Sequence, residues 1–390
     1  MINIVYVLSS TTPFGGGTKS FLTLLDGMLK KGIKAYIIAP DCFGIVPELK
    51  KKGAEIIILD YRYSIYPYLH TFKDYFLFFP RLIARKWLNR KAATLLADIL
   101  KDKNISLIHT NVSVIDIGFR AAKKLGIPHL WHIREYADKD FDMHYFPSKA
   151  FFRKQIKDYK KSYTVCITKD IQFHHQLELF PRSRVIYDAI FSDSLPNSLT
   201  ISSKQQFLLF AGRIEPSKGL DVLLRAYSLS GIDIPLYVAG EVSDQTYFNT
   251  QQRYIKQHGM TDKVSFLGQV SNITDLMRQA QAIIIPSRSE GFGRCMPEAM
   301  AVGCLCIGRN TGGTKEQLDN GLDISGEEIG FRFNSETQLA SQLKEINILS
   351  SEHYKPYIER AYKTVCKLYS LENNQKELYK YYLDIINETH

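Results

Sequence analysis

The feature that most constrains the fold is an alternation of short apolar segments with amphipathic segments, which runs twice along the 390 residues. In the first array we expect strands at residues 2–8, 35–39, 55–59, 107–110, 129–133, 164–167 and 184–187. In the second we expect strands at residues 207–211, 235–239, 264–267, 282–285 and 305–307. Helical patterns separate most of them, as at residues 19–30, 92–100 and 115–125. Such alternation implies parallel sheets, so we predict an α/β protein with two facing Rossmann-like domains and a central cleft.

Chain length and one polar segment give the expected domain limits. At about 150 residues per domain, the chain should hold two or three domains. The polar stretch 191–206 is predicted to link a first domain at 1–190 to a second at 207–373. A last helix at about 375–387, after a break at 372–374, can cross back to the first domain, which would then include 374–390.

Composition excludes several classes of protein. With 45% hydrophobic and 23% charged residues the chain is typical of globular rather than disordered proteins. Its longest apolar runs, such as 75–80 and 282–286, are far shorter than the roughly 20 residues that span a membrane. The first residues lack a basic leader and a small-residue cleavage site, so we expect a cytoplasmic protein. Six scattered cysteines without a CxxC pair favour reduced thiols over a disulfide or zinc framework.

Positive charge is concentrated in the first half. Residues 1–190 hold 30 lysines and arginines against 17 acids. The stretch from Tyr61 to Lys91 combines ten aromatic residues and seven basic ones with the single acid Asp74. This mixture is typical of a peripheral contact with anionic membrane, and a buried aromatic face with a solvated basic face is the alternative. No nucleic-acid-binding signature accompanies it, so we expect no nucleic-acid partner.

Loops that follow the predicted strands carry the candidate site residues, because open α/β sheets bind ligands at the carboxyl ends of their strands. After the first strand comes Gly15-Gly16-Gly17, which matches neither the dinucleotide fingerprint nor the phosphate loop. Glycines before a helix let backbone N–H groups approach an anion or a sugar closely. We therefore expect Gly16 and Gly17 to face a ligand, and a flexible turn is the alternative.

Residues 207–220 (FLLFAGRIEPSKGL) suggest a diphosphate clamp. Arg213 ends the strand, and Lys218 and Gly219 precede a helix that holds Asp221 in its first turn. Two cations, a helix N-terminus and a glycine turn each attract a phosphate. Two solvated surface cations are the alternative interpretation.

Residues 290–298 (EGFGRCMPE) supply two glutamates on different elements. Gly291 and Gly293 should keep the first part a loop, and Pro297 suits the first helical position. Glu290 then lies on the loop and Glu298 in the first helical turn. Carboxylates accept hydrogen bonds from sugar hydroxyls, so beside the clamp the pair could hold two sugar rings. Glu298 could instead only complement the helix dipole, and a glycosidase pair would leave the cations unexplained.

This combination of glycine loop, GR-x4-KG and E-x7-E resembles the retaining glycosyltransferases of GT-B fold, close to family 4 (group 1), over nearly the whole chain. The resemblance implies a nucleotide-sugar donor, UDP- or GDP-linked, and a glycan or lipid-linked acceptor. It also implies that Arg213 and Lys218 contact the diphosphate and that Glu290 contacts the sugar. Glu298 would contact the ribose, and Val270 would lie near the base. The other residues implied in donor binding are Gly16, Gly17, Gly291, Phe292 and Gly293.

The segment 131–135 (WHIRE) resembles the active-site histidine segment of the same family. It ends a predicted strand, so we expect His132 near the donor sugar and the leaving phosphate, although a structural histidine is the alternative. His109, at the end of the preceding strand, is a weaker candidate. Asn111 and Arg134 are assigned to the acceptor side.

Several positions depart from the family pattern. Lys19 stands where many relatives have a glutamate, and Asp188 lies in the Tyr-Asp-Ala that replaces a frequent Asn-Gly at the domain junction. Leu-Cys at 305–306 replaces a common Pro-Val, and Arg309 stands where small residues are usual. Lys19 and Arg309 therefore leave the donor and acceptor preferences open.

The resemblance implies a front-face transfer with retention, in which the departing phosphate accepts the acceptor's proton. The catalytic residues would be His132, Arg213, Lys218 and Glu290, with no cofactor and no metal. The expected setting is cell-surface polysaccharide, lipopolysaccharide or glycolipid synthesis, at the inner face of the cytoplasmic membrane. A nucleotide-sugar epimerase and a non-catalytic nucleotide-sugar-binding partner of a glycosyltransferase remain alternatives.

Overall fold

The computed structural model describes residues 2–13, 16–139, 143–190, 199, 204–349 and 351–389. The chain forms two compact units, one of Met1–Ser192 with Leu371–His390 and the other of Asp193–Ser370. Most of the predicted linker 191–206 lies outside the described residues.

The first unit is built on a parallel sheet of seven strands in the order β3-β2-β1-β5-β6-β8-β9. The strands are β1 (Asn3–Val7), β2 (Lys34–Ala39), β3 (Glu55–Ile58), β5 (Leu107–Thr110), β6 (His129–Ile133), β8 (Ser162–Cys166) and β9 (Ser183–Val185). The central strands β5, β6 and β8 are buried along their whole length. They are rich in apolar residues, as expected for strands covered on both faces, but they also bury polar side chains such as His109 and His132.

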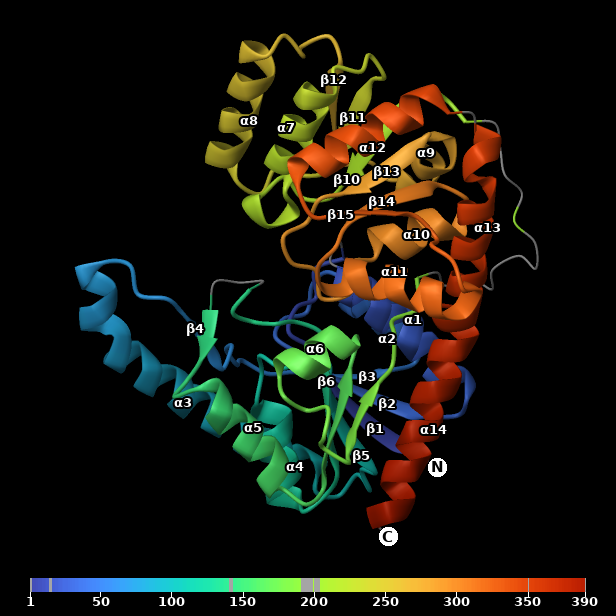
Figure 1. The fold of residues 1–390 in the computed structure, drawn as a ribbon. Helices are drawn as coiled ribbons and strands as arrows, with labels where there is room; N and C mark the ends of the chain where they lie inside the picture. Colours follow the sequence, from blue (N-terminus) through green and yellow to red (C-terminus); the bar gives the residue numbers. More distant parts are fainter. Residues whose placement is uncertain are drawn as a thin grey trace. The chain divides into compact units, whose positions relative to one another are not determined.

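Helices cover this sheet and carry its connections (Figure 1). They are α1 (Gly16–Lys30), α2 (Val46–Lys51), α3 (Phe72–Leu100), α4 (Ile117–Leu125), α5 (Lys149–Asp158) and α6 (Lys169–His174). A small antiparallel pair, β4 (Ile65–Pro67) with β7 (Met143–Tyr145), is an addition that the sequence analysis missed. Three-residue strands such as β4 and β7 carry little alternation in the sequence.

Helix α3 is much longer than predicted. The sequence pattern predicts a helix only at 92–100, but α3 runs over 29 residues from Phe72. It begins with a capping box, in which the side chains of Thr71 and Asp74 each accept a hydrogen bond from the other residue's backbone N–H. The first half was missed because its aromatic and basic residues follow no strong core-facing period, and burial along the helix starts only at Leu82.

The second unit holds a parallel sheet of six strands in the order β12-β11-β10-β13-β14-β15. They are β10 (Leu208–Ala211), β11 (Leu236–Ala239), β12 (Val264–Gly268), β13 (Ala282–Ile285), β14 (Leu305–Arg309) and β15 (Phe331–Phe333), of which only β15 was not expected. The helical elements are the 3-10 turn η1 (Pro216–Lys218), α7 (Leu220–Ser230), α8 (Gln245–Gln257), α9 (Ile273–Gln279), α10 (Cys295–Ala301), α11 (Gly312–Ser325), α12 (Glu336–Ile348) and α13 (Ser351–Leu368). Two α/β domains with parallel sheets are thus confirmed.

The C-terminal helix α14 (Leu371–Thr389) is part of the first unit, where it packs against α1. The predicted helix break at 372–374 is wrong, because these residues form the first turn of α14. The non-helical residues that separate α13 from α14 are 369 and 370. Asn374 is held in that turn by donating a 2.7 Å hydrogen bond from its side chain to the carbonyl of Tyr187. Among the described residues, no helix is long and apolar enough to cross a membrane.

Candidate functional site

The candidate donor residues of the second unit lie at one edge of its sheet. Arg213 follows β10, Val270 follows β12, and Glu290 follows β13. These strands are parallel, so their carboxyl ends meet at the same edge. Val270 is half-buried there. The topology therefore brings loops from distant parts of the sequence to one place.

Lys218 and Glu290 form an ion pair at this edge. The Nζ atom of Lys218 donates to Oε1 of Glu290 at 2.6 Å, and the same oxygen accepts from Oγ of Ser287 at 2.9 Å. Both charged side chains are largely buried, with 20% and 16% of their surface exposed. Burial alone would lower the pKa of Lys218, but attraction and hydrogen bonding to Glu290 outweigh it and raise that pKa above its ordinary value. Lys218 is thus fixed as a cation.

Glycine 219 lets the turn that bears Lys218 approach the end of β13. Its φ of +69° is a left-handed conformation, and a Cβ atom would lie 2.2 Å from the carbonyl oxygen of Pro286. Only glycine fits this close approach. The backbone thereby places the lysine turn directly against the loop that leads to Glu290.

Arg213 has a different environment from Lys218. Its side chain is 57% exposed and its Nη2 lies 3.1 Å from Oε1 of Glu215. Glu215 also accepts a 2.6 Å hydrogen bond from the hydroxyl of Ser217. Arg213 and Lys218 thus stand at the two ends of one turn, and the exposed guanidinium of Arg213 is accessible to an anion.

A network around Asp221 was missed by the sequence analysis. Its carboxylate accepts from Arg288, Arg225 and the hydroxyl of Tyr247. Burial alone would raise the pKa of Asp221, but these bonds lower it well below its ordinary value. Arg288 also donates to the carbonyl of Pro216, so the network ties the β13 loop to the lysine turn. No local sequence motif indicates these contacts, which join residues up to 72 positions apart.

Glu298 lies in the first turn of α10, as predicted. The helix starts at Cys295, however, so Pro297 is its third residue and the prediction of Pro297 at the first position is wrong. Arg294, just before the helix, pairs with the Glu298 carboxylate at 3.0 Å, and both side chains are 16% exposed. Complementing the helix dipole and binding a ribose are both compatible with this position.

The glycine-rich loop before α10 packs against the start of α11. Gly293 has a φ of +75°, and Phe292 is buried. The amide of Gly313 donates a 2.8 Å hydrogen bond to the carbonyl of Glu290, and a Cβ at Gly313 would lie 2.7 Å from the carbonyl of Phe292. Gln317 also donates to that carbonyl. The segment after β14 therefore sets the shape of the loop that carries Glu290.

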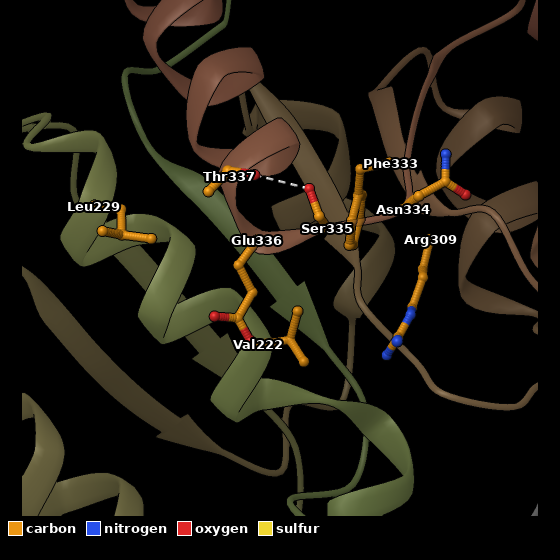
Figure 2. Close-up of a pocket in the computed structure, with 8 residues that line it drawn as sticks. All are labelled: Val222, Leu229, Arg309, Phe333, Asn334, Ser335, Glu336 and Thr337. Atoms are coloured by element: carbon orange, nitrogen blue, oxygen red, sulfur yellow. Dashed lines mark hydrogen bonds between the residues drawn. The ribbon is translucent and has the colours of Figure 1, made fainter.

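Arg309, one of the departures from the family pattern, lines a pocket of about 400 Å³ between α7 and the start of α12. Figure 2 shows Leu229 and Val222 of α7 on one side of this pocket and Arg309 on the other. The Nη1 atom of Arg309 is buried and has no hydrogen-bond partner among the described residues. Glu336 lines the same pocket and pairs with Arg225 at 2.7 Å.

In the first unit, His132 belongs to a buried chain of hydrogen bonds. Its Nδ1 lies 3.1 Å from Nε2 of His109, whose Nδ1 lies 2.6 Å from the hydroxyl of Tyr382 on α14. Burial, with the positive charge of Arg134 nearby, lowers the pKa of His109 to about 3 and that of His132 well below its ordinary value. Both imidazoles are therefore neutral. Nε2 of His132 has no hydrogen-bond partner among the described residues.

Arg134 and Asn111, the two residues assigned to the acceptor side, lie in contact with each other. Nε of Arg134 donates to Oδ1 of Asn111 at 3.1 Å. The guanidinium also pairs with both oxygens of Asp188, at 2.8 and 2.6 Å, and each side chain of that pair is 7% exposed. Asp188, the departure at the domain junction, is thus the counter-ion of Arg134. Nη2 of Arg134 has no hydrogen-bond partner in the described part of the chain.

Gly16 and Gly17 form the first turn of α1 and are exposed, so the expected loop is wrong at these two positions. Gly15 lies outside the described residues. A Cβ at Gly17 would meet nothing within 4 Å. Lys19, in the same helix, is also exposed. Among the described residues of this unit, no contact requires glycine at 17.

A run of acidic residues in the first unit offers candidate metal ligands. The sequence contains Asp138-Lys-Asp-Phe-Asp142, of which residues 140–142 lie outside the described part. Asp138 is engaged with Lys149 at 2.7 Å and His174 at 2.8 Å. Within the described residues no group of three His, Cys, Asp or Glu side chains could hold a metal ion.

The sequence of this chain is similar to those of known glycosyltransferases over part of its length. Residues 191–364 match the family model of glycosyl transferases group 1. An uncharacterized glycosyltransferase of Methanocaldococcus jannaschii is 26% identical over 230 residues, which are 58% of this chain and 62% of that protein. The chain thus aligns with less than two thirds of this curated relative. The family model thus matches less than half of the chain.

Two solved structures are similar over almost the whole chain. A glycosyltransferase from Rickettsia africae superposes with a TM-score of 0.76 at 22% identity, covering 99% of this chain and 98% of that one. Anabaena HepE in complex with UDP and glucose gives 0.73 at 15% identity, covering 97% and 99%. These likenesses establish the GT-B fold.

Proposed function

We propose that this chain, whose residues 191–364 match the glycosyl transferases group 1, is a retaining glycosyltransferase that moves a sugar from a nucleotide-sugar donor to a hydroxyl group. The observation that carries the proposal is the buried Lys218–Glu290 pair, 2.6 Å long, at the carboxyl edge of the matched domain. It places a fixed cation and a carboxylate side by side, which suits a ligand with both phosphates and hydroxyls.

In the proposed donor site, Arg213 and Lys218 bind the diphosphate. As the sugar leaves, negative charge grows on the phosphate, and two preorganised cations stabilise it. Glu290 accepts hydrogen bonds from the sugar and Glu298 from the ribose, with Val270 beside the base. The side-chain cations supply the positive charge, so we propose a reaction that needs no metal.

His132 is the proposed first-unit partner of the donor sugar. Its Nε2 is buried without a hydrogen-bond partner among the described residues, while its Nδ1 is held by His109. A neutral imidazole held in one orientation can hydrogen-bond to a sugar hydroxyl or the leaving phosphate. In the proposed front-face reaction the departing phosphate accepts the acceptor's proton, so His132 orients groups and need not titrate.

The proposed acceptor is a glycan or a lipid-linked glycan, used in cell-surface polysaccharide, lipopolysaccharide or glycolipid synthesis at the inner face of the cytoplasmic membrane. Asn111 and Arg134 lie together on the acceptor side. The Nη2 atom of Arg134 suits a polar acceptor group, because it is buried and without a partner in the described residues. The proposed donor is UDP- or GDP-linked, and the UDP complex of Anabaena HepE supports the former.

A thermal-shift panel with UDP, GDP, ADP and CMP and their sugar conjugates tests the donor site. A ligand at about 100 times its dissociation constant adds roughly 2.7 kcal/mol to the free energy of unfolding. We expect selective stabilisation by UDP or GDP, and loss of that shift in Arg213→Ala. Absence of any shift, confirmed by calorimetry, would overturn the donor site.

Product analysis then tests the reaction. The nucleotide that stabilises the protein is supplied as its sugar conjugates with glycan and lipid-linked acceptors, and the anomeric configuration of the product is determined by NMR. Retention of configuration is expected. An isomerised sugar without acceptor would indicate an epimerase, and nucleotide binding without turnover would indicate a non-catalytic partner.

A further inference from the structure

The first half of α3 carries a stripe of exposed apolar side chains. Five residues form the stripe, with exposed fractions of 89% for Phe72, 75% for Phe76, 64% for Phe79, 67% for Ile83 and 63% for Trp87. Their spacing of three or four residues places them within about 80° of arc on a helix that turns about 100° per residue. Large apolar residues gathered on one exposed face mark an interaction surface.

The stripe points away from the core of its own unit. Leu82, Asn89 and Ala93 of α3 are buried, and they lie roughly 80–120° around the helix from the centre of the stripe. Phe78 attaches the first half of α3 to its own unit, because its ring packs edge-on against Tyr66 and Phe146 of the small β4–β7 region. The helix is thus held by one side and presents the other (Figure 1, blue to cyan).

Basic side chains accompany the stripe. Lys73, Lys86, Arg90 and Lys91 lie along the same helix, where Asp74 is the only acid before Asp98. Two of these cations sit on aromatic faces, with Nζ of Lys91 5.5 Å from the ring of Trp87 and Nζ of Lys86 4.6 Å from that of Phe146. Lysine is depleted at the centre of protein–protein interfaces, whereas lysine next to aromatic rings is typical of membrane-interface helices.

We propose that this face, formed by Phe72, Phe76, Phe79, Ile83 and Trp87 with the flanking cations, inserts into the surface of an anionic lipid bilayer. The apolar stripe would enter the boundary between headgroups and acyl chains, while the lysines and arginines contact anionic headgroups. The helix is already formed and capped by Thr71 and Asp74, so binding incurs no cost of folding it. The inference deepens the proposed function by naming the partner surface, and it can be tested without donor or acceptor.

The two tryptophans allow a direct test. Trp131 is buried and Trp87 is exposed, so Trp131→Phe leaves Trp87 as the only tryptophan reporter. Vesicles of phosphatidylglycerol with phosphatidylcholine are compared with pure phosphatidylcholine vesicles. We expect a blue shift of Trp87 emission and quenching by brominated acyl chains with the anionic vesicles. Raising the salt concentration should weaken both.

Sets of substitutions separate the two components of the face. Phe72→Ser with Phe76→Ser and Phe79→Ser should lower vesicle partitioning by about tenfold or more. Lys86→Gln with Arg90→Gln and Lys91→Gln should lower binding to anionic vesicles by about fivefold per charge. The matched control is Phe173→Ser with Leu179→Ser, which changes side chains that are 70% and 91% exposed outside α3. This control should bind vesicles like the parent chain.

Three results would overturn the inference. The first is that Trp87 emission does not shift and the protein does not co-sediment with anionic vesicles at low salt. The second is that the triple Phe→Ser variant binds these vesicles as well as the parent chain does. The third is that ultracentrifugation shows a dimer of the parent chain that the triple variant does not form. Nucleotide thermal shifts measured on the same preparations distinguish these failures from failure of the donor site. A chain that binds UDP but not vesicles keeps the proposed function and loses the membrane face.

Discussion

The Nζ atom of Lys218 lies 2.6 Å from Oε1 of Glu290, although 72 positions separate the two residues in the chain. The left-handed turn at Gly219 and the end of β13 bring them together. The family resemblance implies that Lys218 contacts the diphosphate and Glu290 the sugar. Their direct contact means that the two proposed roles are coupled, because a change in either side chain alters the charge beside the other.

Lys218→Ala is expected to lower sugar transfer by a factor of about 100 or more at saturating donor, because a preorganised cation is lost where charge develops. Glu290→Gln removes the charge of the partner and should also impair transfer. Both are measured as kcat and KM with the donor found in the thermal-shift panel. Lys315→Gln, at an exposed pair with Asp319, is the control and should keep activity. Normal transfer by Lys218→Ala would contradict the proposed clamp.

Arg213→Ala should weaken nucleotide binding without weakening the fold. Its side chain is 57% exposed and its pair with Glu215 is a surface ion pair, worth about 0–1 kcal/mol. The melting temperature without nucleotide should therefore stay nearly unchanged while the dissociation constant for the nucleotide rises. Calorimetric titration measures the latter. A large loss of stability with unchanged affinity would assign Arg213 a structural role.

Asp188→Asn should destabilise the first unit strongly. It leaves the buried guanidinium of Arg134 without its counter-ion, and breaking a buried pair costs about 3–5 kcal/mol. Urea unfolding monitored by circular dichroism measures the change. Asp384→Asn, which breaks the more exposed pair with Arg184, serves as the comparison and should cost about 1 kcal/mol or less. Equal effects of the two substitutions would refute this account.

Acid should destabilise the first unit through its buried histidines. Burial lowers the pKa of His109 to about 3, whereas the unfolded chain takes up a proton near its ordinary 6.5. The free energy of unfolding should therefore fall as the pH drops from 6.5 toward 3, by up to about 1.4 kcal/mol per pH unit for each such histidine. Above pH 7 His109 is neutral in both the folded and the unfolded chain, so it does not change the free energy of unfolding with pH. Urea titrations between pH 7.5 and 4.5 should show a shallower slope in His109→Gln.

Tyr382→Phe tests the hydrogen-bond chain behind His132. It removes the hydroxyl that lies 2.6 Å from Nδ1 of His109, and leaves that nitrogen buried without a partner. A cost of about 1–3 kcal/mol in unfolding free energy is expected. Nitrogen-15 NMR of the imidazoles should also show a changed tautomer balance at His132 and His109. Unchanged tautomers would mean that the chain does not orient His132.

Local patterns in the sequence were enough to predict two α/β arrays, most strand positions, the loops that carry Arg213, Lys218 and Glu290, and the helix start that carries Glu298. This works because buried parallel strands need continuous apolar runs, and because glycine and proline mark the turns between them. The same reasoning missed β4, β7, β15 and most of α3, which are too short or too weakly periodic to recognise. The roles of the site residues remain predictions.

What only the tertiary structure decided is which groups meet. The pairs Lys218–Glu290, Arg134–Asp188 and His109–Tyr382 join residues 72, 54 and 273 positions apart. Such partners are chosen by how strands and helices pack, and burial then makes each contact strong and each substitution costly. Charge and aromatic content along α3 were visible in the sequence. Its exposed stripe was not, because exposure depends on which side of the helix the rest of the unit covers.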